Sequence, residues 1–202
     1  MKIAIIGAGN LGSSIADGLY INNMITELYL TKNNLSTLTK WKKIPNVSVS
    51  SNNVEAVNNS DIIILCVQPS QFKNLSNDLK KYIKEKHTII STITGLTLGI
   101  LESTFGINRN IVRAMPNTAI SVGKSTTCLC SNSFGKTKLN LAQSIFNNLG
   151  ESFIVKEKNM QAATVLCASG IAFWMRLIRS TAQGGVQLGF ESSESLNMSI
   201  ST

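Results

Sequence analysis

The chain has few histidines, prolines and acidic residues: 202 residues include one His, three Pro and 11 Asp or Glu. It also has no uncharged apolar run of about twenty residues, the length with which a helix crosses a bilayer. Lys2 precedes only four apolar residues before Gly7, too few for the apolar segment of a secretory signal. We therefore expect a soluble, cytoplasmic protein, and the 43% apolar content is enough for a hydrophobic core.

Potential metal ligands are also sparse. The four cysteines, Cys66, Cys128, Cys130 and Cys167, form no CxxC pair, and three lie in apolar contexts typical of buried free thiols. The single histidine, His87, stands in a lysine-rich turn before a predicted strand, where we expect a surface position. The sequence therefore predicts no metal site.

Basic residues outnumber acidic ones, with 19 Lys or Arg and a formal net charge of +8. The lysines are spread along the chain, apart from small groups at 40–43 and 80–86. Such groups are typical of solvated helix faces. We predict no nucleic-acid partner, because net charge alone is no binding motif.

Short apolar runs alternate with segments of helical period through the first 155 residues. The runs are apolar at nearly every position, as in "DIIILCV", which is typical of parallel strands covered by helices on both faces. We predict strands at 3–6, 28–30, 47–49, 62–67, 88–93 and 111–114, with helices around 11–19, 35–41 and 72–83. The pattern predicts an α/β fold with a parallel sheet.

The character of the chain changes after residue 155. Residues 158–188 contain no proline and no strand-like alternation, which favours one long helix or two abutting helices with a break at Gly184-Gly185. The final "ESSESLNMSIST" offers serine N-caps and the first turns of another helix. We therefore divide the chain into an α/β domain, 1–155, and a helical part, 156–202.

Three glycines follow the first predicted strand in "IAIIGAGNLG" and open a predicted helix. In that context a GxGxxG pattern indicates a dinucleotide site. Gly7 permits the tight turn, Gly9 leaves no side chain between backbone and pyrophosphate, and Gly12 lets the helix pack closely on the strand. The phosphates are expected at the helix N-terminus, where unpaired N–H groups and the helix dipole favour an anion.

The end of the second predicted strand selects the dinucleotide. An acidic residue there would bind the ribose 2′-OH of NAD, but the segment reads "LYLTKNN" and places Lys32 beside two asparagines. A cation with amide donors favours the extra phosphate of NADP(H). We therefore predict NADPH, with NADH as the alternative cofactor.

The turns after the other strands should lie near the same ligand, because nucleotides on such sheets lie across the carboxyl ends of the strands. These turns contain Asn53, Val67, Pro69, Gly95 and Asn117. The two prolines of these turns, in "VQP" and "MPNT", are equally compatible with simple strand termination.

At this point the motifs resemble a known family. The segments "IAIIGAGNLGSSIADGL", "DIIILCVQP", "STITGLTL", "VRAMPNTAISVG" and "ATVLCASGIAFWMRLIRSTAQGGVQLGF", in this order, resemble Δ1-pyrroline-5-carboxylate reductase over nearly the whole chain. The resemblance implies a Rossmann-type domain followed by the start of an all-helical dimerisation domain. It also implies hydride transfer from NAD(P)H to a cyclic imine, which yields L-proline, and a homodimer or higher homo-oligomer.

The resemblance carries site residues over to this chain. It implies that the cofactor lies on the glycine loop, that its adenosine end lies near Lys32 and Asn53, and that its nicotinamide end lies near the turns after two strands. It also implies a substrate loop at Thr164 and 167–170. The cofactor residues implied are Gly7, Gly9, Asn10, Leu11, Gly12, Lys32, Asn53, Val67, Gln68, Pro69 and Asn117, and the substrate-loop candidates are Thr164, Ser169 and Gly170.

The chain departs from the family pattern at several positions. Gln68 stands where the family usually has lysine, and the substrate loop reads "CASGIAF" where the family usually has "SGSGPAY". The family pattern also continues beyond Thr202 through further helices that close the substrate site, so the activity of the 202-residue chain alone is left open.

No catalytic dyad is expected, because a cyclic imine that arrives protonated needs only orientation and hydride. Arg176 and Arg179 offer cations for a substrate carboxylate, although their spacing equally suits a solvent-facing helix surface. Two alternatives remain: a truncated or non-catalytic NADP-binding module, and a β-hydroxyacid-dehydrogenase-like reductase. The second needs a lysine early in the long helix, and none occurs after Lys158.

Overall fold

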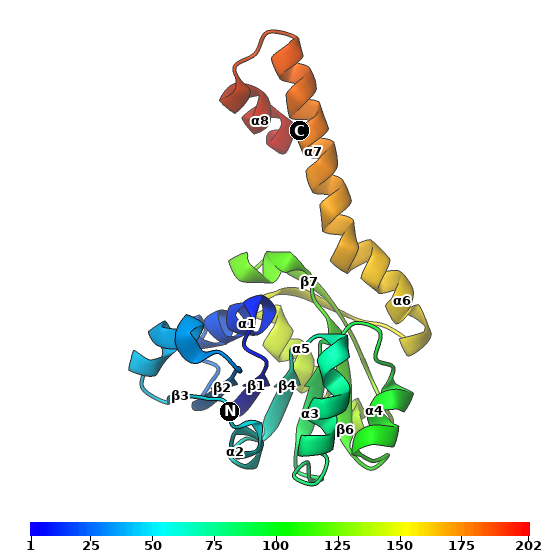
Figure 1. Ribbon diagram of the computed structural model, residues 1–202. Helices are drawn as coiled ribbons and strands as arrows, with labels where there is room; N and C mark the ends of the chain where they lie inside the picture. The colour runs from blue at the N-terminus through cyan, green and yellow to red at the C-terminus, as the bar shows by residue number, and fades with distance from the viewer.

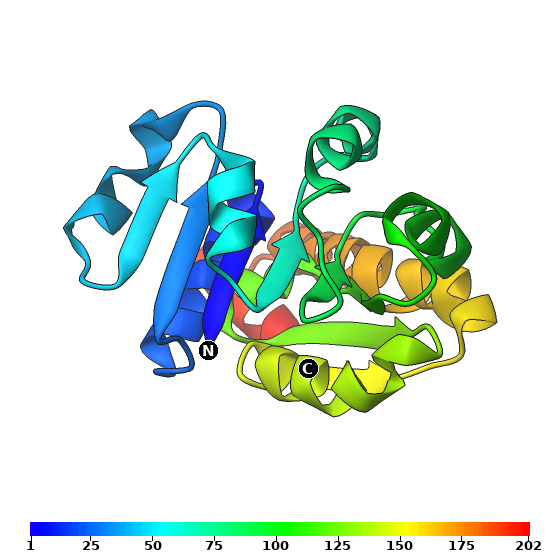
Figure 2. The same cartoon turned by 90° about the horizontal axis from the view of Figure 1, so that it is seen from below.

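A computed structural model describes residues 1–202 and contains one eight-stranded sheet with helices on both faces (Figure 1, Figure 2). The strand order is β3-β2-β1-β4-β5-β6-β7-β8, and every neighbouring pair is parallel except β6 and β7. The strands are β1 (Lys2–Ile6), β2 (Glu27–Thr31), β3 (Val47–Ser50), β4 (Ile62–Leu65), β5 (Thr88–Ser91), β6 (Asn110–Met115), β7 (Ser125–Ser131) and β8 (Gly150–Ile154).

The helices divide between the sheet and a C-terminal extension. Those around the sheet are α1 (Asn10–Ile21), α2 (Asn53–Asn58), α3 (Phe72–Leu79), α4 (Leu98–Phe105) and α5 (Leu139–Asn147), with short 3₁₀ segments η1 (Leu35–Lys43), η2 (Pro69–Gln71), η3 (Thr118–Val122), η4 (Phe134–Lys138) and η5 (Glu157–Asn159). The extension consists of α6 (Met160–Ala163), the π-helical η6 (Thr164–Ser169), α7 (Gly170–Gln187) and α8 (Ser192–Ser201).

Two apolar cores of 21 buried residues each lie on opposite faces of the sheet. Along β1, Ile3 and Ile5 join the core under α1 and α5, whereas Ala4 and Ile6 join the core under α2, α3 and α4. Successive strand side chains point to opposite faces. Burial on both faces therefore explains why these strands are apolar at every position.

The six predicted strands are confirmed as β1 to β6, but the prediction missed β7 and β8. β7 reads "STTCLCS", and its buried hydroxyls are paired: Ser125 Oγ and Thr127 Oγ1 lie 3.1 Å apart, and the Asn117 N–H donates to Ser125 Oγ. One partner lies eight residues away and the other two residues away. A strand whose buried polar groups are hydrogen-bonded in this way needs no apolar run, and the prediction depended on such runs.

The long C-terminal helix is continuous from Glu157 to Gln187, with a π-helical stretch at 164–169. The predicted break at Gly184-Gly185 is wrong, because α7 passes through both glycines and ends at Gln187. A Cβ on Gly185 would lie 2.0 Å from Ser195 Oγ. Gly185 is therefore a contact point that lets α8 fold back closely on α7.

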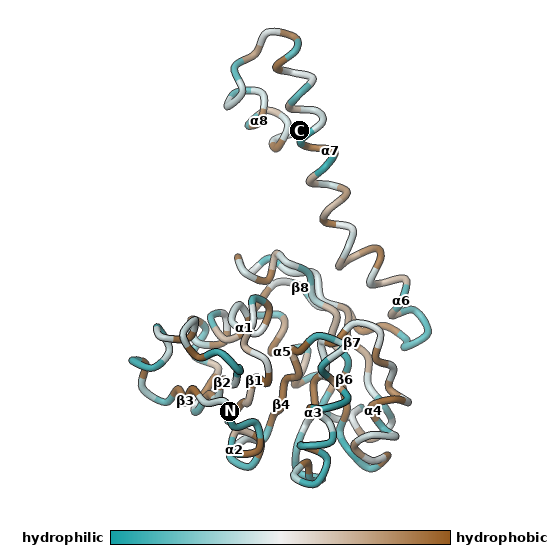
Figure 3. Tube along the Cα trace, viewed as in Figure 1, coloured by the Kyte–Doolittle hydropathy of each residue, from teal (hydrophilic) through white to brown (hydrophobic).

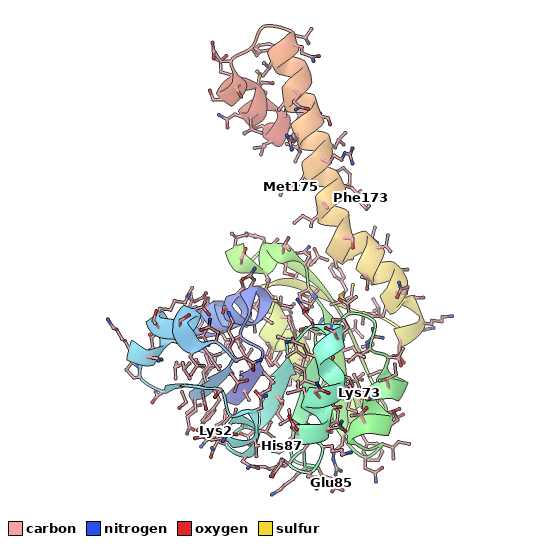
Figure 4. The ribbon with its side chains drawn as sticks, in the orientation of Figure 1. Lys2, Lys73, Glu85, His87, Phe173 and Met175 are labelled. Atoms are coloured by element: carbon pink, nitrogen blue, oxygen red, sulfur yellow. The ribbon has the colours of Figure 1, made fainter.

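This extension exposes large apolar side chains. Phe173 is 66% exposed, Trp174 67% and Leu188 83%. Figure 3 shows apolar residues along α7, and Figure 4 shows Phe173 and Met175 projecting from a stretch of α7 that lies away from the sheet. The helix 157–187 is long and apolar enough to cross a membrane, by length and composition alone. In its most apolar stretch of 18 residues, 6% of the residues are buried. Arg176 and Arg179 interrupt it, so no uncharged run of about twenty residues occurs.

His87 lies just before β5 and is 1% exposed, so the predicted surface position is wrong. Its Nδ1 accepts the Lys84 N–H at 2.9 Å, and its Nε2 is buried without a partner. Figure 4 places His87 near Glu85 at the lower end of the sheet domain. Burial lowers the pKa of His87 first, and the nearby charges of Lys86 and Lys84 lower it further.

This environment makes stability depend on pH. Because the folded-state pKa of His87 lies below its ordinary value near 6.5, the unfolded chain binds a proton more readily, and stability falls as pH drops through about 6.5. We expect the free energy of unfolding by urea to decrease between about pH 7.5 and about pH 5.5. His87→Asn keeps an acceptor near the Lys84 N–H and removes the titration, so it should flatten that slope. An equal slope in the variant would contradict this assignment.

Candidate cofactor and substrate site

The glycine loop connects β1 to α1 across the end of β2. Gly7 has a φ of +93°, and a Cβ there would lie 2.7 Å from Val67 Cγ1. The N–H groups of Gly7 and Ala8 donate to the Thr31 carbonyl at 3.1 and 2.8 Å. Gly7 is therefore required by a left-handed turn packed between β2 and β4.

The other two glycines differ in what surrounds them. A Cβ on Gly12 would lie 2.5 Å from the Gly7 carbonyl oxygen, whereas a Cβ on Gly9 would meet nothing within 4 Å. Gly9 is the N-cap of α1 and makes no side-chain cap, and the first turn holds no acidic residue. The unpaired N–H groups at the start of α1 therefore have no side-chain partner, which suits an anion, whereas Gly12 itself is buried.

A first cleft of about 390 Å³ adjoins this loop, at the carboxyl ends of β1, β2 and β4. No carboxylate lines this cleft, but Lys32 does. Lys32 Nζ donates to Thr37 Oγ1 at 2.8 Å, and this hydrogen bond holds the cation at the cleft. The lining residues are Gly7, Gly9, Thr31, Lys32, Asn33, Asn34, Cys66, Val67, Gln68 and Gln71.

Of the predicted cofactor residues, Asn10, Leu11 and Asn117 line a second cleft, described next, whereas Gly12, Asn53 and Pro69 line neither cleft. Asn53 is the first residue of α2, whose N-cap is Asn52, and Pro69 begins η2. Gln68 stands where the family that this sequence resembles usually has lysine. It is the N-cap of η2, and its backbone N–H donates to Gln71 Oε1 at 3.1 Å. The first cleft therefore holds one lysine, Lys32, and neutral amides.

A second cleft of about 570 Å³ lies on the other side of the first turn of α1. None of its lining residues is ionisable. It brings together α1, the turn after β5, the end of β6 and η6, which are distant in sequence. The lining residues are Asn10, Leu11, Ser14, Thr92, Thr94, Met115, Pro116, Asn117, Thr118, Ile120, Ser121, Thr164, Ala168 and Ser169.

Asn117 joins two walls of the second cleft. Its Nδ2 donates to the Cys167 carbonyl at 3.0 Å, and its Oδ1 accepts the Ala119 N–H at 3.1 Å. Cys167 lies in η6, the π-helical stretch. Such wide turns occur frequently at functional sites. Asn117 therefore ties the turn after β6 to the predicted substrate loop.

The substrate-loop candidates are not equivalent. The Thr164 hydroxyl donates to the Met160 carbonyl at 2.9 Å, whereas the Ser169 hydroxyl makes no hydrogen bond within the chain and lines the second cleft. Gly170 is buried and lies outside the lining. Ser169 is therefore the free donor of the loop. Arg176 and Arg179 are exposed on α7 and line neither cleft.

An ion pair that the sequence did not predict joins β6 to the start of the long helix. Arg113 Nη1 lies 3.1 Å from Glu157 Oε1, and the two side chains are 10% and 35% exposed. The same carboxylate oxygen accepts the Leu98 N–H at the start of α4. No local signal in the sequence indicates this pair, because the two residues are 44 positions apart. Glu157 thus fixes the origin of the long helix on β6 and α4.

No group of three or more His, Cys, Asp or Glu residues is arranged to hold a metal ion. All four cysteines are free thiols. Burial raises the pKa of the Cys66 thiol to about 12, against a smaller lowering by its hydrogen bond with Thr92. Cys66 is therefore a neutral thiol at the first cleft, with no nucleophilic character at neutral pH.

Comparison with known proteins places this site in context. Residues 2–95 match the family described as NADP oxidoreductase, coenzyme F420-dependent, and residues 157–202 match the pyrroline-5-carboxylate reductase dimerisation family. Pyrroline-5-carboxylate reductase 1 of Dictyostelium discoideum is 37% identical over 99% of this chain, which spans 39% of that protein. Pyrroline-5-carboxylate reductase 2 of the same organism is 34% identical over 100% of this chain and 73% of its own length.

Solved structures agree. The Plasmodium falciparum pyrroline carboxylate reductase with NADP bound has a TM-score of 0.87 and 30% identity, covering 100% of this chain and 75% of its own. The 3-hydroxyisobutyrate dehydrogenase of Mycobacterium tuberculosis, at 13% identity and a TM-score of 0.64, shares the fold alone. With a relative above 30% identity matched over most of both chains, this chain belongs to the pyrroline-5-carboxylate reductase family.

Proposed function

We propose that this chain reduces the cyclic imine 1-pyrroline-5-carboxylate to L-proline with NADPH as the hydride donor. The observation that carries the proposal is the pair of clefts that meet where the glycine loop enters α1: Gly7 and Gly9 line the first, and Asn10 and Leu11 line the second. One is basic and amide-lined and adjoins the glycine loop, whereas the other is polar, contains no ionisable side chain and faces the π-helical loop. Together they suit a dinucleotide and a small neighbouring substrate.

The glycine loop fits a diphosphate. A Cβ on Gly9 would meet no atom within 4 Å, so space is open beside this residue. The first turn of α1 has no side-chain cap, so its backbone N–H groups are available to a diphosphate in that space. At the adenosine end, Lys32 and Asn53 are proposed to face the ribose and its 2′-phosphate. At the nicotinamide end, the proposed residues are Val67, Gln68, Pro69 and Asn117, of which Asn117 acts by positioning because its side chain is already bonded.

The second cleft fits a reaction that needs orientation more than acid–base catalysis. When bound, the reduced nicotinamide supplies a hydride to the carbon of the C=N bond. A protonated imine needs no further proton, so a lining without His, Asp, Glu or Lys is sufficient. Ser169, whose hydroxyl is free, is proposed to donate to the substrate carboxylate, with Thr164 and Gly170 shaping the loop around it.

The test is a turnover assay on the full 202-residue chain. We expect NADPH oxidation that depends on added 1-pyrroline-5-carboxylate and yields proline by chromatography. An assay in which NADPH binds without any substrate-dependent oxidation would instead support a non-catalytic NADP-binding module. The Lys40→Ala variant is a suitable control, because Lys40 pairs with Asp17 at 2.6 Å outside both clefts.

Lys32 is expected to select NADPH over NADH. Lys32→Ala should weaken NADPH binding about tenfold, equivalent to roughly 1.4 kcal/mol, because it removes a charge-assisted contact to the 2′-phosphate. NADH binding should be unchanged. Fluorescence titration of both cofactors, with Lys40→Ala as the matched control, measures the difference. A tenfold preference of the parent chain for NADH would reject the assignment.

We infer that the apolar face of α7 and α8 is covered by a second copy of the chain. A groove of about 880 Å³ runs between these helices, and residues 157–202 match a family described as a dimerisation family. A bilayer is the less favourable cover, because Arg176 and Arg179 would each cost about 2.5–3.5 kcal/mol near its centre. The apolar lining residues are Met175, Ile178, Ala182, Val186, Leu196 and Ile200. A cytoplasmic location remains a prediction that agrees with this inference.

The oligomer is tested by sedimentation. We expect the parent chain to sediment as a dimer or larger homo-oligomer. Met175→Glu places a charge on the groove, where Met175 is 61% exposed, and should raise the dissociation constant at least about tenfold. Ser180→Glu places the same charge at an exposed site outside that groove and should leave assembly intact. A monomeric parent chain, or equal effects of both variants, would contradict the inference.

A further inference from the structure

Two cysteine thiols meet at the junction of the sheet and the long helix. Cys128 Sγ, on β7, lies 3.8 Å from Cys167 Sγ, on η6, although the residues are 39 positions apart. Cys128 is 3% exposed, and Cys167 is partly exposed. The proposed reduction uses neither thiol, and no further ligand joins them in a metal-binding group.

Neither thiol lines the second cleft, but each lies beside residues that do. Cys128 pairs with Met115 in the β6–β7 register, and Met115 lines the cleft just before the turn that contains Asn117. Cys167 stands between Thr164 and Ala168, both of which line the cleft. The hydrogen bond from Asn117 to the Cys167 carbonyl already joins η6 to the turn after β6. A covalent bond between the thiols would therefore fix η6, one wall of the cleft, against the strand that supports Met115, a residue of another wall.

We propose that Cys128 and Cys167 form a dithiol site that a disulfide oxidant, such as oxidised glutathione, converts to an intramolecular disulfide. The partly exposed Cys167 reacts first. Its thiolate attacks one sulfur of the oxidant, the oxidant's S–S bond breaks, and one glutathione thiolate leaves while a mixed disulfide forms on Cys167.

The second step closes the bridge. Cys128 loses its proton and attacks Cys167 Sγ, the mixed disulfide breaks, and the second glutathione thiolate leaves. The two protons from the cysteines end on the two glutathione thiols, so two cysteine thiols are oxidised and one oxidant molecule is reduced. Burial, and to a smaller extent the neighbouring Cys167, raise the pKa of the Cys128 thiol to about 12. Cys128 is therefore the slow, resolving thiol and Cys167 the point of entry.

Closure changes the cleft that the proposed function assigns to the substrate. A disulfide needs about 2.0 Å between sulfurs, so η6 and β7 must approach from the present 3.8 Å contact. Because small misplacements of a substrate site are costly, we expect kcat/KM for 1-pyrroline-5-carboxylate to fall at least about tenfold. The glycine loop and Lys32 lie outside the bridge, so NADPH affinity should stay within about twofold. This consequence for turnover rests on the proposed function, whereas the bridge itself does not.

The experiment treats the folded chain with oxidised glutathione and follows its intact mass and peptide map. We expect the loss of two hydrogens, a linked peptide pair containing Cys128 and Cys167, and reversal by dithiothreitol. Cys128→Ser should stop at the mixed disulfide and gain one glutathionyl group. Cys167→Ser, changed at the more exposed position, should gain none. Cys130→Ser is the matched control on the same strand and should close as the parent does.

Three results would overturn the proposal: free thiols at both positions after oxidation, a parent chain that stops at the mixed disulfide, or a bridge to Cys130 or Cys66. The measurement is independent of activity. If the chain shows no turnover of the imine before oxidation but forms the bridge after oxidation, the proposed function fails and the dithiol site stands. If turnover is normal and no bridge forms, the dithiol proposal fails alone.

Discussion

Gly9→Ala is expected to weaken NADPH binding at least about tenfold, roughly 1.4 kcal/mol, without unfolding the chain. The backbone at Gly9, with φ −77° and ψ −156°, is open to alanine, and the added Cβ meets no atom of the chain within 4 Å. The methyl group would instead fill the space proposed for the diphosphate. Fluorescence titration with NADPH and thermal unfolding of the same sample measure the two effects separately.

Gly12→Ala is the matched comparison three residues along the same helix. Its Cβ would lie 2.5 Å from the Gly7 carbonyl oxygen and 3.1 Å from Ile5 Cγ2, so the backbone of the loop must shift. We expect this variant to lose about 1–3 kcal/mol of stability, visible as a lower melting temperature. Normal NADPH affinity in Gly9→Ala would show that the diphosphate does not lie on this turn.

Glu157→Gln is expected to lower the free energy of unfolding by about 2 kcal/mol, because it leaves the buried Arg113 guanidinium without a counter-charge. Breaking a fully buried pair typically costs more, but the Glu157 side chain is 35% exposed, so water offsets part of the loss. The same oxygen also holds the N–H of Leu98, so α4 should loosen with it. Urea unfolding measured by circular dichroism gives the value.

Glu85→Gln provides the control for that substitution. Glu85 Oε1 lies 3.6 Å from Arg109 Nη1, and its side chain is 79% exposed, so the same chemical change there should cost at most about 0.5 kcal/mol. Equal losses in the two variants would show that Glu157 does not hold the long helix on the sheet domain. A larger loss in Glu157→Gln supports the role given to the pair.

Local signals of the sequence were sufficient for much of the fold. The strands β1 to β6 are apolar at nearly every position because both faces of the sheet are covered, and this pattern is visible without any partner. The glycine loop was also predicted from the sequence, because the contact of Gly12 with Gly7 joins residues only five positions apart. β7 was not, because Ser125 and Thr127 are polar and are buried only through hydrogen bonds that the fold supplies.

The candidate site divides in the same way. Lys32 was predicted from its position after β2, and the structure places it at the first cleft beside Thr37. Nothing in "KEKHTII" indicates that His87 is buried, because its burial comes from the packing of the surrounding elements. Asn53 and Pro69 were expected near the cofactor from their turns, yet neither lines the first cleft.

The sequence by itself determined the parallel strands, the diphosphate-binding type of turn and the basic residue after β2, because each depends on residues close together in the chain. Only the tertiary structure decided which distant groups meet. The ion pair of Arg113 with Glu157 and the contact of Cys128 with Cys167 join residues 44 and 39 positions apart. Such contacts depend on where the whole sheet and the long helix come together, and no local pattern records that.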